Sequence, residues 1–258
     1  CMATVREMGK SRPSDAAGGS EGKCHFKSKT GSQASRALIA LRSSVHLRLV
    51  LNPPATTTAL PHLASATGGL PSSVRWAQLI LADRLRPGDV VVDATMGNGH
   101  DTLFLSRCVS PGGHVHAFDV QAAALEETRK RVPAETSTLY LAGHETMAQN
   151  LPAELHGHLA AIMFNLGYLP GSDKTCITHT ETTLAALAQA VELLKPGGIL
   201  TLAVYPGHEG GADESREIAK WAAGLDARRF EVQHLRPVNR SAAPPELWTI
   251  WKTAPMKK

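Results

Sequence analysis

The feature that most constrains the fold is a regular alternation of short apolar runs and helical segments along residues 71–258. Apolar runs bounded by turn residues predict strands at 90–94, 114–120, 139–142, 159–164, 199–204, 230–237 and 247–253. Helices are predicted at 72–85, 100–108, 122–131, 180–194 and 213–225. Because strands alternate with helices, we expect an α/β fold with a mostly parallel seven-stranded sheet and helices on both faces. The last two strands lack an intervening helix, which predicts an antiparallel edge.

The composition is that of a folded domain and disfavours several other classes. Apolar residues make up 43% of the chain and charged residues 19%, so disorder of the whole chain is not expected. No run reaches the roughly 18 apolar residues of a transmembrane helix, so we expect no membrane association. The four cysteines lie far apart, and no histidine pair has a carboxylate or thiol at ligand spacing. We therefore expect neither a disulfide scaffold nor a metal site.

The first 70 residues differ from the remainder in charge. They carry nine Lys or Arg against three Asp or Glu, whereas residues 71–258 carry eighteen against twenty. An acid-poor, Ser- and Arg-rich leader resembles an organellar transit peptide, and a disordered extension or read-through upstream of a later start is the alternative. We expect a disordered basic leader at 1–70, a folded domain at 71–258, and localisation in the chloroplast, with the cytoplasm as the alternative.

The strongest local motif joins the first predicted strand to the following helix. It reads Asp93-Ala-Thr-Met-Gly97-Asn-Gly99-His-Asp-Thr102. Gly97 and Gly99 lack a Cβ, so a ligand can approach the backbone and face the free N–H groups of the helix. Asp119 ends the second strand, twenty residues after Gly99, where a carboxylate can accept both ribose hydroxyls of an adenosine.

The same loop favours one nucleotide cofactor over another. A dinucleotide fingerprint has a third glycine where this chain has Thr102. An acid at a strand end followed by G-x-G is instead typical of S-adenosylmethionine binding. The ammonium and sulfonium of that cofactor favour a nearby acid such as Asp93. S-adenosylmethionine is therefore the expected cofactor, and an NAD-dependent oxidoreductase is the alternative.

A second motif, Asn165-Leu-Gly-Tyr168, follows the fourth strand, which we expect beside the first. Amino-methyltransferases often carry Asn/Asp-Pro-Pro-aromatic here, where the polar group holds the amine and the ring covers the substrate. Asn165 and Tyr168 match, but Leu-Gly replaces both prolines, which weakens the case for the exocyclic amine of a flat base. A turn-forming asparagine and a packed tyrosine are the structural alternatives.

Three further segments carry candidate residues. Tyr205-Pro-Gly-His208 follows the fifth strand, and His208 is a candidate to orient substrate, to accept a proton, or simply to brace the loop. Asp173 and Lys174 follow the Asn165 motif and are candidates to meet substrate or to brace that loop. Four arginines near the last strands are candidates for one basic RNA-binding patch, namely Arg228, Arg229, Arg236 and Arg240. An ordinary solvated set of charges is the alternative, and it is preferred for Arg228 and Arg229.

Together these motifs resemble the tRNA 5-(aminomethyl)-2-thiouridine methyltransferase family, long labelled as rRNA methylases. The resemblance covers about residues 71–255 and rests on D-A-T-x-G-N-G-H-D-T, A-F-D-x-Q, F-N-L-G-Y-L-P-G-x-D-K and Y-P-G-H-x-G-G. It implies a Rossmann-like class I SAM-dependent methyltransferase. The reaction it implies is methyl transfer to the aminomethyl group of wobble 5-aminomethyl-2-thiouridine, which gives 5-methylaminomethyl-2-thiouridine.

The resemblance also assigns site residues and a partner. Its cofactor pocket is Asp93, Thr95, Gly97, Asn98, Gly99, His100, Asp119, Gln121 and Asn165. Its catalytic candidates are Asn165, Tyr168 and His208, and its substrate candidates are Tyr205, His208, Asp173 and Lys174. The expected partner is a tRNA anticodon loop, and a homodimer is considered, although the sequence does not set the oligomeric state. An rRNA or small-molecule amine methyltransferase and a non-catalytic RNA-binding module stay open as alternatives.

Overall fold

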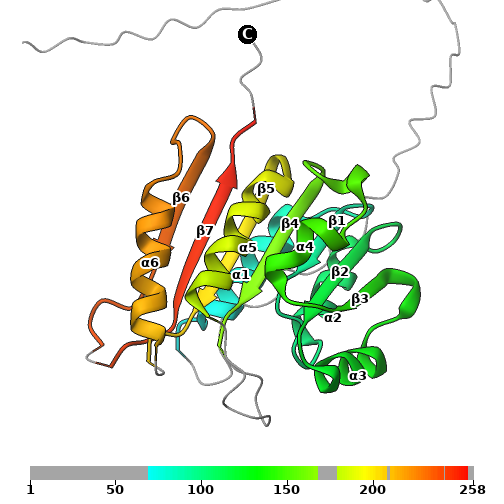
Figure 1. Cartoon of the computed structure of the whole chain (residues 1–258), viewed down its shortest axis with the longest axis horizontal. Helices are drawn as coiled ribbons and strands as arrows, with labels where there is room; N and C mark the ends of the chain where they lie inside the picture. The colour runs from blue at the N-terminus through cyan, green and yellow to red at the C-terminus, as the bar shows by residue number, and fades with distance from the viewer. Residues whose placement is uncertain (1–68, 168–178, 208–209, 241, 255–258) are drawn as a thin grey trace, which may run out of the picture. The chain divides into compact units, whose positions relative to one another are not determined.

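The computed structural model describes residues 69–167, 179–207, 210–240 and 242–254 (Figure 1). The strands are β1 (Val90–Asp93), β2 (His114–Asp119), β3 (Ser137–Leu141), β4 (Leu159–Asn165), β5 (Leu194–Val204), β6 (Phe230–Leu235) and β7 (Glu246–Lys252). The helices are α1 (Ser73–Arg84), α2 (His100–Val109), α3 (Ala122–Arg131), α4 (Met147–Asn150), α5 (Thr180–Leu193) and α6 (Gly211–Ala223). The predicted leader lies almost wholly outside the described residues, so it stays a prediction.

The strands form one sheet in the order β3-β2-β1-β4-β5-β7-β6. β1 runs parallel to both β2 and β4, and β4 runs parallel to β5. β7 is antiparallel to β5 and to β6. The expected mostly parallel sheet with an antiparallel edge is therefore confirmed. The carboxyl ends of β1, β2, β4 and β5 lie at one edge, where ligands bind in sheets of this kind.

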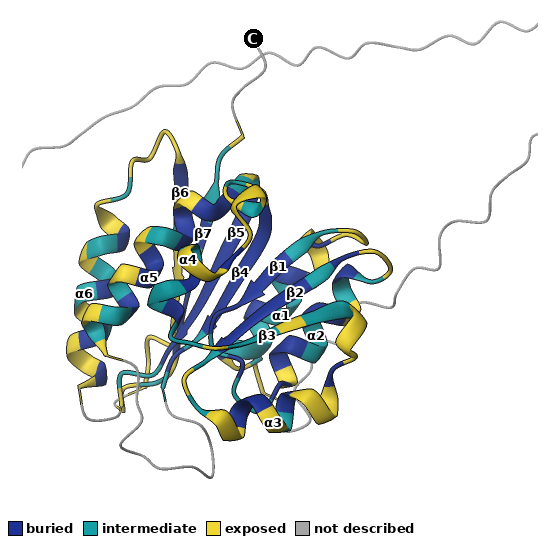
Figure 2. Cartoon of the chain, turned by 45° about the vertical axis from the view of Figure 1, so that its right-hand side comes forward, coloured by how far each residue is buried: buried dark blue, intermediate teal, exposed yellow. Residues whose placement is uncertain are grey.

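Helices cover both faces of the sheet because successive strand residues point to opposite sides. Val92 of β1 packs in the core that α4, α5 and α6 form, with Phe164 and Leu202 from neighbouring strands. Val91 packs in the core that α1 and α2 form, with Met163 of β4. Figure 2 shows the central strands buried between these helices. Burial on both faces explains why the strands read as continuous apolar runs.

Most predicted elements are found within two residues of their expected limits. Ser72 caps α1 as expected, because its hydroxyl accepts a hydrogen bond from the Arg75 N–H at 3.2 Å. One expected limit was wrong, and one segment had no assignment. β5 begins at Leu194 rather than 199, with a register shift opposite Leu159–Ala161. Residues 143–158, which the pattern left unassigned, hold α4 and two 3₁₀ turns, which are too short to show helical periodicity. In the described ranges, no helix is long and apolar enough to cross a membrane.

Candidate cofactor and substrate site

The loop after β1 is built around a buried carboxylate. Asp93 is fully buried, its Oδ2 accepts a hydrogen bond from the Thr102 hydroxyl at 2.7 Å, and its Oδ1 accepts one from the Thr95 N–H at 3.2 Å. Burial, with the nearby carboxylate of Asp101, raises the pKa of Asp93 to about 7. Asp93 therefore holds the two ends of the loop together from the inside.

The two glycines of the loop adopt left-handed backbone conformations. Gly97 has φ +49° and Gly99 has φ +77°. A Cβ on Gly99 would lie 2.9 Å from the Cα of Thr128 in α3, which is a steric clash with backbone. The Thr128 hydroxyl also donates to the Gly97 carbonyl at 3.1 Å. The loop thus closes against α3 only because residue 99 has no side chain. The sequence pattern gave no signal for Thr128.

Asp119 joins the end of β2 to this loop. Its Oδ2 accepts a hydrogen bond from the Gly97 N–H at 3.0 Å, and its Oδ1 accepts one from the Gln121 N–H at 2.9 Å. Burial raises its pKa, and those backbone donors oppose the rise. Asp119 is only partly buried, so its carboxylate keeps acceptor capacity toward the outside. The structure therefore brings Asp119 and the glycine loop together, as their positions at strand ends predict.

The outer side of the loop faces the end of α3. Arg131 Nε donates to the Asn98 carbonyl at 2.7 Å, and Arg131 Nη1 lies 3.4 Å from His100 Nδ1. His100 is exposed. Asn98 and His100 are thus next to the glycine loop, but on its rim.

Asn165 lies beside the same loop because β4 pairs with β1. Its backbone N–H donates to the Thr95 hydroxyl at 2.7 Å. Its side-chain Nδ2 donates to Oδ2 of Asp101 at 3.4 Å, and Gln78 Nε2 of α1 donates to Oδ1 of the same carboxylate at 2.8 Å. Asp101 is buried, and sequence reasoning missed it because an acid in the first turn of a helix is usually explained by the helix dipole.

The remaining candidates divide into one described residue and four that lie outside the described ranges. Tyr205 follows β5 and is partly buried; burial raises its pKa, and the carboxylate of Asp101 adds to the rise. Its ring lies near Gly167, where a Cβ would be 3.8 Å from Tyr205 Cδ2. Tyr168, Asp173, Lys174 and His208 are the four outside the described ranges.

The two histidines of β2, His114 and His116, have structural partners. His114 Nε2 lies 2.9 Å from the Thr138 hydroxyl, and His116 Nδ1 lies 2.9 Å from the Tyr140 hydroxyl. Burial lowers the pKa of His116 to about 4, so it is neutral at physiological pH. Among the described residues, no group of three or more His, Cys, Asp or Glu is placed to hold a metal ion.

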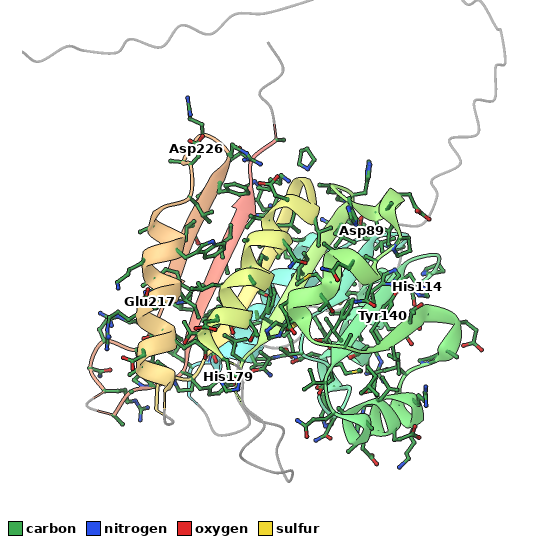
Figure 3. All side chains as sticks on the ribbon, viewed as in Figure 1. Asp89, His114, Tyr140, His179, Glu217 and Asp226 are labelled. Atoms are coloured by element: carbon green, nitrogen blue, oxygen red, sulfur yellow. The ribbon has the colours of Figure 1, made fainter. Side chains whose placement is uncertain are left out.

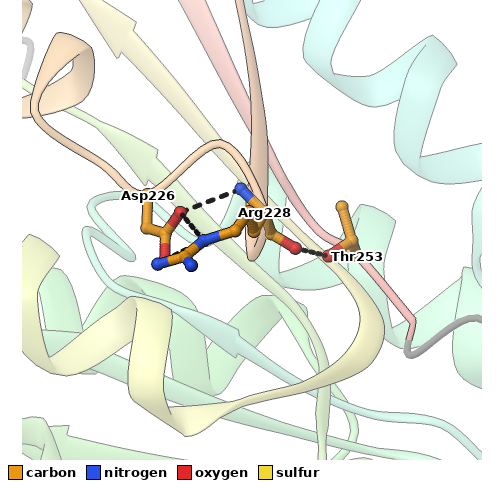
Figure 4. Close-up of polar contacts among 3 residues, drawn as sticks. All are labelled: Asp226, Arg228 and Thr253. Carbon is orange, nitrogen blue, oxygen red and sulfur yellow. Dashed lines mark hydrogen bonds and ion pairs between the residues drawn. The ribbon is translucent and has the colours of Figure 1, made fainter.

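The four arginines do not form one patch, and for Arg228 and Arg229 the preferred alternative of ordinary solvated charges fits. Arg228 and Arg229 precede β6, and Arg236 and Arg240 follow it, so the six-residue strand separates the pairs by roughly 20 Å. Arg228 is held by Asp226 at 3.0 Å (Figure 4), and Arg229 pairs with Glu192 at 2.9 Å. Figure 3 shows Asp226 at the end of the sheet opposite His179, the residue that precedes α5. Only Arg236 and Arg240 lie at the carboxyl edge of the parallel strands.

The strand order, the antiparallel β7 and the acid–Gly-x-Gly loop with a second acid after β2 define the fold of class I, Rossmann-like, SAM-dependent methyltransferases. Residues 115–251 match the family model described as "Putative rRNA methylase", and the chain belongs to this family. The resemblance inferred from the motifs is thereby confirmed.

Individual relatives agree with this assignment. The chain is 37% identical over 183 residues to the chloroplastic tRNA (mnm⁵s²U34)-methyltransferase of Arabidopsis thaliana, which covers 66% of this chain and 64% of that protein's length. A structure titled as an rRNA methylase from Clostridium thermocellum is 36% identical, covering 71% of this chain and 99% of its own, with a TM-score of 0.68. A Streptococcus mutans methyltransferase in complex with SAH is 34% identical, with the same coverage and a TM-score of 0.63.

Proposed function

We propose that the chain is a SAM-dependent tRNA methyltransferase that N-methylates the aminomethyl group of wobble 5-aminomethyl-2-thiouridine. The observation that carries this proposal is the 37% identity, over 183 residues, to a plant protein named for that methyltransferase. The chloroplastic name of that relative also supports a chloroplast location for this chain, and the acid-poor leader supports it independently. A homodimer stays a prediction.

The residues present fit S-adenosylmethionine. The relative in complex with SAH shares the fold at 34% identity. Gly97 and Gly99 leave the backbone open to a ligand, and the partly exposed Asp119 can accept ribose hydroxyls. We assign the remaining pocket positions to Thr95, Asn98, His100 and Gln121 around this loop. When bound, the cofactor supplies an electrophilic methyl group on a sulfonium.

The chemistry that the chain must supply is positioning and proton removal. A free alkylamine has a pKa near 10.4, so it is mostly protonated and has no lone pair for attack. A partly buried site disfavours the ammonium and so favours the reactive amine. Asn165 lies beside the cofactor loop, where its side chain can hold the amine in line with the transferred methyl. Tyr205 lies across from it, and Tyr168, His208, Asp173 and Lys174 are assigned to the same edge by sequence position.

An RNA loop can reach this edge along β6. Arg236 and Arg240 are exposed there, next to the exposed side chains of Leu235 and Val238. Anticodon loops are recognised through phosphates and through unstacked bases, which require cationic and apolar contacts. The edge therefore offers both kinds of contact at the same end of the sheet as Asn165.

The test is product identification. The full chain is incubated with labelled S-adenosylmethionine and tRNA from cells that lack this methylation, and the digested nucleosides are read by mass spectrometry. A methyl group gained on 5-aminomethyl-2-thiouridine supports the proposal. Binding of S-adenosylmethionine without methylation of that nucleoside would redirect the search to rRNA or small amines. Binding of NAD in place of S-adenosylmethionine, measured by calorimetry, would overturn the cofactor assignment.

A further inference from the structure

Asp101 is a buried acid that the proposed reaction does not yet use. It is 8% exposed and sits in the first turn of α2, between α1 and the end of β4. Its two carboxylate oxygens each accept a side-chain amide, from Gln78 at 2.8 Å and from Asn165 at 3.4 Å. An ordinary helix-dipole residue would be solvated, so two amide partners from two other elements indicate a more specific role.

The chemistry of a carboxylate fixes which way each amide points. An ionised carboxylate has acceptors and no donor, so both amides must present their NH₂ groups to it. The orientation of Gln78 is supported from its other end, because Arg75 Nη1 donates to Gln78 Oε1 at 3.1 Å. Because Asn165 presents its NH₂ group to Asp101, its Oδ1 points away from Asp101. An amide oxygen in that orientation is an acceptor for the N–H groups of an amine.

We propose that Asp101 is a positioning residue that orients the side-chain amide of Asn165, so that its Oδ1 accepts a hydrogen bond from the substrate amine. The inference rests on the proposed function, in which Asn165 holds the amine. It predicts that protonated Asp101, which could donate to Oδ1, would favour the opposite amide orientation. The titratable or charged groups that face Asp101 are Asp93 of β1, His100 of α2, Tyr205 after β5 and, through Gln78, Arg75 of α1.

The first test is Asp101→Asn in the full chain. This isosteric change lets residue 101 donate to Oδ1 of Asn165 and so reverses the amide. We expect kcat on 5-aminomethyl-2-thiouridine tRNA to fall roughly 100-fold, as for a misplaced reacting group. The affinity for S-adenosylmethionine should stay within about twofold by calorimetry. A loss of cofactor affinity that matches the loss of activity would overturn the proposal, because Asp101 would then be a cofactor ligand.

The second test is a double substitution that exchanges the acid and the amide. If the role of Asp101 were merely structural, this exchange would not restore activity. In Asp101→Asn/Asn165→Asp, the amide at 101 donates to a carboxylate at 165, which again presents an oxygen to the amine. We expect kcat to recover to within roughly tenfold of the original chain. Asp89→Asn is the matched control. Asp89 immediately precedes β1, at the end of that strand away from the cofactor loop, and it pairs with Lys195 at 2.6 Å. A double variant no better than Asp101→Asn would contradict the proposal.

The third readout needs no substrate. The side-chain NH₂ signals of Asn165 in ¹⁵N NMR, assigned by comparison with Asn165→Asp, should shift strongly in Asp101→Asn. They should also shift when Asp101 protonates as the pH falls. Unchanged signals in Asp101→Asn would overturn the proposed pairing. If the unaltered chain binds S-adenosylmethionine but does not methylate this nucleoside, the proposed function fails while these NMR signals still decide the role of Asp101.

Discussion

Replacing Asp93 with asparagine separates the free energy of a buried charge from that of its hydrogen bonds. In Asp93→Asn, Oδ1 can still accept from the Thr95 N–H, and Nδ2 can donate to the Thr102 hydroxyl, which accepts as readily as it donates. The shape of the side chain is also kept. The variant therefore removes the charge at a fully buried position and little else.

The expected free energy follows from the pKa. Burial raises the pKa of Asp93 from an ordinary 3.8 to about 7, a rise of about three units, and each unit corresponds to about 1.36 kcal/mol. As the pH rises above about 4, the unfolded chain loses this proton while the folded chain retains it. The free energy of unfolding therefore falls with rising pH until the folded group also ionises near pH 7. The penalty is absent at low pH and reaches about 4 kcal/mol above pH 7.

Urea unfolding of both chains between pH 4 and pH 8 measures this penalty. The histidines His116 and His144 have lowered pKa values from burial, so they stabilise the fold as pH rises through the same window. Their contribution cancels when the two chains are subtracted. The stability advantage of Asp93→Asn should be near zero at pH 4 and grow to about 4 kcal/mol at pH 8. Two parallel stability curves would refute the reasoning.

Three other substitutions test the site. Gly99→Ala places a Cβ 2.9 Å from the backbone of Thr128 at φ +77°, so the free energy of unfolding should fall by about 1–3 kcal/mol and the midpoint of thermal unfolding should fall with it. An unchanged midpoint would show that the loop relaxes freely. Asp119→Ala should weaken S-adenosylmethionine binding roughly 10- to 100-fold in calorimetry, because the ribose contact is lost and the Gly97 and Gln121 N–H groups lose their acceptor. Unaltered affinity would show that Asp119 is not part of the cofactor pocket. Arg236→Ala/Arg240→Ala should weaken tRNA binding and reduce the slope of log K against log salt by roughly 0.7 per charge. Arg228→Ala is the control and should leave the slope unchanged, because Arg228 is already paired with Asp226.

The parts of the fold that depend on local signals were predictable. The limits of α3 match the predicted range, and β1 was found from three successive valines before Asp93. Parallel strands also let the position of Asn165 be predicted, because the carboxyl ends of neighbouring strands meet at one edge. Each of these inferences needs only periodicity, turn residues and the rule that polar residues follow buried strands.

The parts that depend on packing between distant segments were not predictable. Asp101 and Gln78 are 23 residues apart, and their pairing depends on how α1 crosses the start of α2. Thr128 matters because α3 packs one turn against Gly99, and no local pattern marks that contact. The separation of the four arginines into two pairs was not predictable for a related reason, since residues close in sequence can lie at opposite ends of one strand.

The buried acids make chemical sense only in relation to what the site must bind. Burial raises the pKa of both Asp93 and Asp101, and the carboxylate of Asp101 adds to the rise at Asp93, so the ionisation of each acid opposes folding. The proposed reaction brings a sulfonium close to an amine that is protonated in solution, and these two cations repel each other. The amine must therefore be neutral when it binds beside Asn165, whereas the sulfonium keeps its charge. The negative charge of Asp93 beside the cofactor loop attracts the sulfonium, most effectively where water is excluded. The charge of Asp93, which weakens the empty fold, would therefore stabilise the loaded site, and this explains why the loop keeps an acid there although a neutral residue of the same shape would make a more stable domain.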